Sequence, residues 1–436
     1  MNPAIATGDA LLLERLQRAA FGYFMDYANP VNGLVADTSR SGSPCSIAVV
    51  GFALSCYPIA VERGWIERAQ AAARALAALR FFRESVQSDA PDATGYKGFY
   101  YHFLDMKSGG RVWQCELSVI DTALLLSGIL VCGVWFDAEN SQEEEIRQLA
   151  DALYRRVDWL WARGGMETIS QGWKPECGFF HYGWEGYNEA TILYILALAS
   201  PNFPLPADCF ASWTATYQWE SVYDIPYLYG GPLFMHFFSQ AWIDFRGIQD
   251  AFMREKNCDY FENSRRAIAV HREYARRNPH GYECYGADFW GLTAGDGPGN
   301  EELRESGRDR RFFGYTARGV PFGPDDGTIG PWAMLASLPF APASALAGAR
   351  NLLENYPRSV PQDRFSSGFN PTLCAGSGGW LSDGWYGLDQ GLLVMSIENF
   401  RSDFVWKIMR RCLYVRSGLA RAGFSGGWLE KENRGE

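Results

Sequence analysis

Apolar residues recur every three or four positions along most of this chain, the spacing typical of amphipathic α-helices. Such stretches cover 9–29, 45–62, 66–87, 116–137, 141–162, 188–200, 231–251, 258–278, 328–338, 342–356, 388–400 and 402–416. They predict about twelve helices. Alternating strand patterns are scarce and short, and Gly98–Phe103 is the best strand candidate.

The connections between these helices alternate between short and long. The long connections are rich in Gly, Pro and aromatic residues and cover 88–115, 163–187, 201–230, 279–327 and 357–387. This alternation predicts an all-α fold, an (α/α)6 barrel in which a double ring of helical hairpins carries the long loops on one face as a cleft. A helical solenoid is the alternative, but no repeat of its usual length is visible. No linker interrupts the pattern, so residues 1–436 are predicted to form a single domain.

Aromatic residues are unusually frequent, at 15% of the chain, and many lie in the Gly-rich loops. Loops have little core to fill, so these rings need another explanation. Stacking on carbohydrate is the simplest, because aromatic faces pack against sugar rings. The alternative is that the loops fold back over a large helical core.

The net charge of −10 argues against a nucleic-acid partner, which would require basic patches. No apolar run is long enough to cross a membrane, so no membrane partner is predicted. A neutral glucan or oligosaccharide is compatible with this charge.

The first residues, Met1–Gly8, lack the basic and apolar regions of a secretory signal. We therefore expect a cytoplasmic protein, or a periplasmic one if a leader precedes this sequence, and the oligomeric state stays open.

Ten cysteines are scattered without CxxC pairs, which predicts neither a disulfide framework nor a zinc site. Cys56 and Cys132 fall inside apolar helical patterns and are predicted to be buried thiols. The five histidines are dispersed and form no HExxH motif. No metal and no other cofactor is predicted.

The first candidate for chemistry is Glu189, which lies just before the apolar run Ile192–Ser200. We expect Glu189 in the first turn of a helix that Asn188 caps. Trp184 and Tyr187 precede it on a Gly-containing loop. A carboxyl group beside aromatic rings suits the cleavage of a glycosidic bond, because the rings hold the sugar and the acid protonates the departing oxygen. The alternative is that Glu189 only complements the helix dipole.

The second candidate is Asp121, which begins an apolar run that Ser118 could cap. In the predicted ring, the helices of Asp121 and Glu189 are neighbouring inner helices. Their carboxyl groups would then face each other, one as general acid and one as base. Alternatively, Asp121 is a structural buttress. Glu116 is a third catalytic candidate, although its offset from Asp121 does not place both on one helical face.

Other residues are candidates for binding sugar. The carboxylates Asp105 and Asp389 lie in aromatic surroundings and could either hold hydroxyl groups or cap turns. His102 could contact substrate or simply serve as a hydrogen-bond partner, and the same alternatives apply to His236. The predicted sugar platforms are Trp113, Trp184, Tyr187, Trp290 and Trp385.

Several stretches over some 300 residues, in the same order, resemble a known family. They are His102-Phe103-Leu104-Asp105, Glu116-Leu117-Ser118-Val119-Ile120-Asp121-Thr122-Ala123-Leu124-Leu125, Gly186-Tyr187-Asn188-Glu189-Ala190, Trp242-Ile243-Asp244-Phe245-Arg246, Phe289-Trp290-Gly291-Leu292-Thr293-Ala294, Asp389-Gln390-Gly391 and Ile397-Glu398-Asn399. The chain thus resembles the bacterial glucoamylase-like domain family, which includes the endo-β-1,2-glucanases of glycoside hydrolase family 144.

The resemblance implies an (α/α)6 barrel that cleaves β-1,2-glucan or its oligosaccharides with inversion. By position, Glu189 is similar to the family's essential glutamate, and Asp121 lies in the motif that holds its essential aspartate. The chain departs from the family at Ser239-Gln240, where many members have Ser-His, and this change is expected to alter a cleft contact.

The leading hypothesis is therefore a β-1,2-glucan hydrolase with Glu189 as general acid and Asp121 acting on water. Two alternatives remain: a transglycosylase that passes glucan to an acceptor sugar, and a glucan-binding protein without turnover. Binding alone would need aromatic residues more than paired acids.

Overall fold

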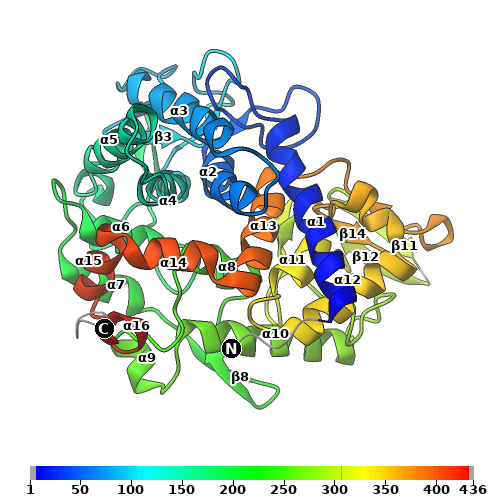
Figure 1. Ribbon diagram of the computed structural model, residues 1–436. Helices are drawn as coiled ribbons and strands as arrows, with labels where there is room; N and C mark the ends of the chain where they lie inside the picture. Colours follow the sequence, from blue (N-terminus) through cyan, green and yellow to red (C-terminus); the bar gives the residue numbers. More distant parts are fainter. Residues whose placement is uncertain (1–5, 306, 432–436) are drawn as a thin grey trace.

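The helices of this computed structural model, which describes residues 6–305 and 307–431, form two concentric rings (Figure 1). The outer helices are α1 (Thr7–Asp26), α3 (Arg68–Glu84), α5 (Ser141–Arg155), α7 (Ala207–Thr214), α10 (Tyr260–Arg277) and α12 (Pro342–Asn355). The inner helices are α2 (Ile47–Glu62), α4 (Val119–Trp135), α6 (Thr191–Ala199), α8 (Phe234–Trp242), α11 (Pro331–Ala336) and α13 (Gly387–Ser402). Outer and inner helices alternate along the chain, which confirms the predicted (α/α)6 barrel. Of the N-terminal stretch discussed above, residues 1–5 lie outside the described residues.

Burial distinguishes the two rings. Every residue of α6 is buried, and so is every residue of α2 from Ile47 to Ala60. The outer helix α5 instead buries one stripe, which includes Ile146, Ala150 and Leu153. An inner helix is covered on all sides, whereas an outer helix keeps a polar face toward water. The hydrophobic core therefore fills the space between the rings and inside the inner one. Cys56 and Cys132 lie in this core as predicted.

The connections also alternate, as predicted. Every connection from an outer to an inner helix is long, and these loops cover 27–46, 85–118, 156–190, 215–233, 278–330 and 356–386. The returns from inner to outer helices are shorter, at 63–67, 136–140, 200–206, 243–259 and 337–341, with α9 (Ala251–Glu255) inside the fourth. Since the helices alternate in direction, the six long loops gather on one face. The sequence did not predict 27–46 as one of the long loops.

Short strands occur within these loops. They are β1 (Cys45–Ser46), β2 (Gly95–Tyr96), β3 (Phe99–Tyr101), β4 (Phe103–Leu104), β5 (Leu117–Ser118), β6 (Gly172–Lys174), β7 (Gly178–Phe179), β8 (Trp219–Val222), β9 (Ile225–Leu228), β10 (Ala294–Gly295), β11 (Glu301–Glu305), β12 (Arg308–Phe312), β13 (Thr316–Ala317), β14 (Phe369–Asn370) and β15 (Trp380–Leu381). The antiparallel sheet β2-β3-β5-β6-β7 joins the 85–118 loop to the 156–190 loop. It contains β3, which lies within the predicted strand.

Two helix predictions were wrong. The outer helix α7 lies within 201–230, where Pro201, Pro204 and Pro206 suggested a loop, and its short apolar face is too brief to show a period. The predicted helix 402–416 is not a ring member. It is divided into α14 (Phe404–Arg411) and α15 (Leu413–Arg421), and α14 crosses the middle of the view in Figure 1. The short helix α16 (Gly427–Lys431) follows.

No described helix has both the length and the apolar character needed to cross a membrane.

Glycines allow the inner helices α2 and α4 to approach closely. A Cβ atom at Gly128 would lie 2.0 Å from the carbonyl oxygen of Gly51, and one at Gly51 would lie 2.3 Å from that of Leu124. Side chains larger than hydrogen would push the helices apart. This contact fixes the position of α4, which carries Asp121 at its N-terminal end.

Candidate active site

A cavity of about 370 Å³ lies where the N-terminal ends of the inner helices converge. Helix α4 contributes Asp121, α8 contributes Phe234, α11 contributes Trp332, and α13 contributes Asp389. Six of the residues predicted from the sequence line this central cavity: His102, Glu116, Asp121, Trp184, Glu189 and Asp389. The ring geometry therefore brings the predicted acids together, although they are far apart in the sequence.

Two further cavities continue the central one into a cleft. The Trp113 cavity, of about 590 Å³, shares His102, Tyr315 and Leu388 with it. The Tyr187 cavity, of about 520 Å³, shares Ala317 with it. The central cavity, which holds the acids, thus adjoins both of the other cavities.

Glu189 lies in a turn immediately before α6. The hydroxyl of Ser239 on α8 donates to the Glu189 carbonyl at 2.7 Å, and the same hydroxyl accepts the amide of Ile192 at 3.1 Å. The helix begins only at Thr191, so Glu189 is not in its first turn as predicted. Asn188 accepts the amide of Ala190 at 2.9 Å and closes the turn rather than capping α6.

The neighbour of Ser239 has a structural role. Gln240 is buried between α8 and α10, where its amide donates to the carbonyl of Tyr260 at 2.9 Å. The departure from the family at Ser239-Gln240 therefore lies away from the cleft, contrary to expectation. His236 is also a buried hydrogen-bond partner, with Nε2 located 2.9 Å from the carbonyl oxygen of Gly230.

The carboxyl group of Glu189 is poorly solvated. Its Oε2 atom is buried and has no hydrogen-bond partner in the protein. Burial raises the pKa of Glu189 to about 7, and the negative charge of Asp121 adds to this effect. Near neutral pH, a large fraction of Glu189 therefore carries a proton that it can donate into the cavity.

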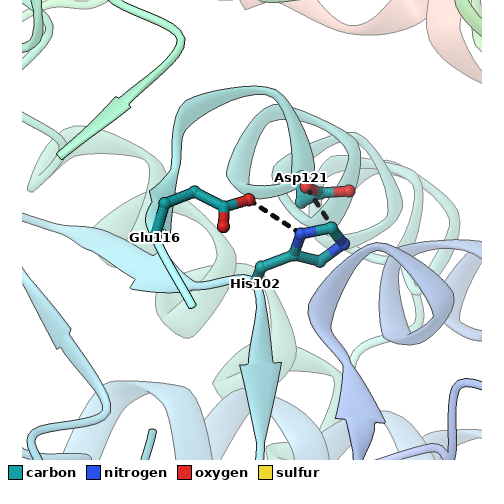
Figure 2. Close-up of side chains that lie close together, drawn as sticks. All are labelled: His102, Glu116 and Asp121. Atoms are coloured by element: carbon teal, nitrogen blue, oxygen red, sulfur yellow. Dashed lines mark hydrogen bonds and ion pairs between the residues drawn. The ribbon is translucent and has the colours of Figure 1, made fainter. Parts of the chain in front are cut away.

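On the facing side, His102 lies between two acids (Figure 2). Its Nδ1 atom is 2.8 Å from Glu116 Oε1, and its Nε2 atom is 3.5 Å from Asp121 Oδ2. Asp121 is held in place by Ser118, whose hydroxyl accepts the Asp121 amide at 3.2 Å and donates to Oδ2 at 2.5 Å. The predicted capping by Ser118 is confirmed. Glu116 precedes β5 rather than lying on the helix, and for this reason it can reach the same histidine.

His102 is a cation in this arrangement. Burial opposes its charge, but Asp121 and Glu116 outweigh burial and raise the pKa of His102 to about 9. In return, the hydrogen bond from His102 overcomes the effect of burial and lowers the pKa of Glu116. Ligand atoms of the three residues lie within 4.8 Å of one another, close enough to hold a metal ion. The imidazolium already supplies the positive charge there, and both of its N–H groups point to carboxylates.

Two more acids line the cleft. Asp389, in the first turn of α13, has a buried Oδ2 atom without a partner, and burial raises its pKa well above the usual range. Asp37 lines the Trp113 cavity, and burial raises its pKa to about 6. Asp37 was not predicted from the sequence. It follows the apolar residues 34–36 in the same way that the predicted residue Asp105 follows Phe103-Leu104.

Three of the five predicted platforms line the cleft. Trp113 is 69% exposed in its own cavity, Trp184 lines the central cavity, and Tyr187 lines the third. Tyr315, which is 62% exposed and borders two cavities, was missed within the 279–327 loop. Tyr315 lies in a Gly-rich loop, as Trp113 does.

The other three predicted binding residues lie outside these cavities. Trp290 is completely buried in the core, so its prediction as a platform was wrong. Trp385 has Arg364 5.1 Å from its ring centroid and donates its indole N–H to the Arg364 carbonyl. Asp105 accepts the amides of Lys107 and Ser108 and closes a turn, which was the alternative considered for it.

Comparison with known proteins agrees with this geometry. The model of the Glycoamylase family, described as "putative glucoamylase", matches residues 181–413, just over half of the chain. The chain belongs to this glucoamylase-like family. Among solved structures, a Bacteroides uniformis protein of the same description superimposes with a TM-score of 0.85 at 28% identity, over 98% of this chain and 100% of its own.

Two other proteins similar to this chain have named activities. An endo-β-1,2-glucanase from Chitinophaga pinensis, solved with sophorotriose and glucose, has a TM-score of 0.81 at 25% identity, over 97% of this glucoamylase-like chain and 99% of its own. An exo β-1,2-glucooligosaccharide sophorohydrolase (non-reducing end) from Parabacteroides distasonis is 25% identical over 95% of this chain. The chain spans 58% of the length of that curated relative.

The charge on His102 can be tested directly by nuclear magnetic resonance titration. We expect the imidazole to titrate near pH 9, and Glu116→Gln to lower this value because one of the two carboxylates is removed. Since the pKa is raised from 6.5, the charge interaction stabilises the fold fully below pH 6.5 and is lost as the pH rises through about 9. Glu84→Gln, on the exposed face of α3, serves as the control. Titration near pH 6.5 in both wild type and Glu116→Gln would contradict the assignment.

Proposed function

We propose that this protein is a glycoside hydrolase that cleaves β-1,2-linked glucan or its oligosaccharides. One observation carries the proposal: Glu189, with a pKa of about 7 and an unpartnered buried oxygen, lines the same cavity as Asp121. Glycosidic cleavage with inversion needs one carboxyl group that donates a proton and a second that acts on water in the same cleft. The activities named for the Chitinophaga and Parabacteroides relatives support the β-1,2 linkage.

In the proposed reaction, Glu189 donates its proton to the glycosidic oxygen as the bond from that oxygen to the anomeric carbon breaks. A water molecule attacks the anomeric carbon from the opposite face. Asp121 accepts a proton from this water, directly or through a further water molecule, so the anomeric configuration inverts. Exchange of protons with solvent then returns Glu189 to its acid form and Asp121 to its carboxylate.

The rest of the cleft suits a neutral sugar chain. Trp113 and Tyr315 offer exposed rings, and Trp184 lines the central cavity. The unpartnered oxygens of Glu189 and Asp389 are buried polar atoms that a substrate hydroxyl could satisfy. The overall charge of −10 does not hinder the approach of a polymer without phosphate or carboxylate groups.

Glu189→Gln tests the proposed acid. The amide cannot supply the proton, so release of oligosaccharides from linear β-1,2-glucan should fall by about 10²–10⁴-fold. Binding of the glucan should persist, because the variant keeps the shape of the side chain. Glu84→Gln is again the matched control. No product from wild type would refute the substrate, and an active Glu189→Gln would refute the assigned acid.

The pH dependence follows from the raised pKa of Glu189. The acid must be protonated, so kcat/KM should decline above about pH 7, by about tenfold for each further pH unit. The measurement is the initial rate on a soluble β-1,2-linked oligosaccharide between pH 5 and 9, at substrate concentrations well below KM. A rate that stays constant to pH 9 would exclude a proton donor with this pKa.

A further inference from the structure

The most exposed aromatic rings lie on the long loops of the cleft face. Among the described residues, the Trp, Tyr and Phe side chains that are more than half exposed are Trp113, Tyr182, Tyr315 and Phe322. All four belong to the loops 85–118, 156–190 and 278–330. Trp113 and Tyr315 line the cleft, whereas Phe322, at 71% exposed, lies just outside it. One exposed apolar residue is ordinary, but rings gathered on the face of the cleft require an explanation.

Phe322 lies at the edge of the Tyr187 cavity. The next two residues, Gly323 and Pro324, line this cavity, and so does Tyr229. The rings of Phe322 and Tyr229 pack against each other, with centroids 5.5 Å apart and planes inclined by 57°. We term this pair the mouth platform. It joins the 278–330 loop to the 215–233 loop.

The turn that carries Phe322 is held against Gly231. The amide of Gly319 donates to the carbonyl of Pro324 at 3.2 Å and closes the turn. The amide of Val320 donates to the carbonyl of Gly231, also at 3.2 Å. A Cβ atom at Gly319 would lie 2.4 Å from the carbonyl carbon of Gly231, so the two backbones are in direct contact. Backbone contacts therefore fix the position of Phe322, although its ring is exposed.

Two buried histidines hold the other side of this contact. Nε2 of His271, on α10, lies 3.0 Å from the carbonyl oxygen of Gly231, and Nε2 of His236, on α8, lies 2.9 Å from that of Gly230. A carbonyl oxygen only accepts, so each Nε2 atom carries the donated hydrogen. The wall beside the mouth platform is thus anchored to both rings of helices. A ligand meets a surface that is already formed, which lowers the cost of binding.

The chemistry of this end of the cleft suits a neutral sugar. Among the described residues that line the Tyr187 cavity, Glu185 is the charged one, and Thr216 and Gln218 add polar side chains. A sugar presents an apolar C–H face to an aromatic ring and hydroxyl groups to such polar neighbours. The cavity shares Ala317 with the central cavity. A glucan chain that passes Glu189 can therefore continue toward the mouth platform.

We propose that the mouth platform is a sugar-binding site for a part of the glucan chain distant from the bond that is cleaved. This inference rests on the proposed function. A chain that extends from Glu189 through the Tyr187 cavity places a sugar against the ring of Phe322 and removes that ring from water. Short oligosaccharides do not reach it. The mouth platform therefore makes longer chains better substrates without changing the chemical step.

Phe322→Ala tests this site with linear β-1,2-linked oligosaccharides of increasing length. For the shortest oligosaccharide that wild type cleaves, kcat/KM should not change. For longer ones kcat/KM should fall by about 3–10-fold, mainly through a higher KM, because the stacking contact is lost. Phe322→Trp keeps a ring at this position and should retain the preference of wild type for longer chains.

Three results would contradict the inference, and they differ in what else they refute. Equal kcat/KM of Phe322→Ala and wild type at every length would overturn the inference and leave the proposed function intact. The same loss at every length would also overturn it, because the change would then reflect a structural role of the turn. No product from wild type at any length would refute the proposed function, and the inference with it.

Leu413→Ala is the control for loss of an exposed apolar side chain. Leu413 is 78% exposed at the start of α15 and lies outside the long loops, so this variant should keep the KM of wild type at every length. Thermal unfolding shows that each variant is folded before its kinetics are compared. Light scattering gives the oligomeric state. A dimer formed by wild type but not by Phe322→Ala, with unchanged length dependence, would assign Phe322 to an interface between copies and overturn the inference.

Discussion

The alternating directions of the helices in the double ring are the constraint on which the site depends. Because each inner helix begins on the same face, the N-terminal ends of α4, α6 and α13 converge there, although they are separated by about 70 to 270 residues of sequence. The glycine contact between α2 and α4 keeps the inner ring narrow enough for these ends to meet. Asp121, Glu189 and Asp389 share one cavity for this reason.

Within the cavity, the acids differ in protonation because their surroundings differ. Glu189 has a buried oxygen without a partner, so its neutral form is favoured. Glu116 instead receives a hydrogen bond from the imidazolium of His102, which lowers the pKa of Glu116. A proton donor and a proton acceptor can thus coexist at one pH, as acid–base cleavage requires.

The sequence predicted the ring, the long loops on one face and the acidic residues of the central cavity, because these depend on apolar periodicity and on short local motifs. It failed where tertiary contacts decide the outcome. Trp290 and Trp113 both lie in Gly-rich aromatic segments, yet only the packing of the folded chain buries one and exposes the other. The hydrogen bond between Arg40 and Tyr386 joins residues 346 positions apart, so no local pattern could indicate it. The helix α7 was missed because eight residues are too few to establish a period.

A crystal structure of the Glu189→Gln variant with a linear β-1,2-linked oligosaccharide would test the central claim most directly. Our account predicts a glycosidic oxygen within hydrogen-bond distance of the substituted side chain at position 189, with Asp121 on the opposite side of that sugar and Trp113 against a ring face. An oligosaccharide bound along the cleft with every glycosidic oxygen out of reach of position 189 would contradict it.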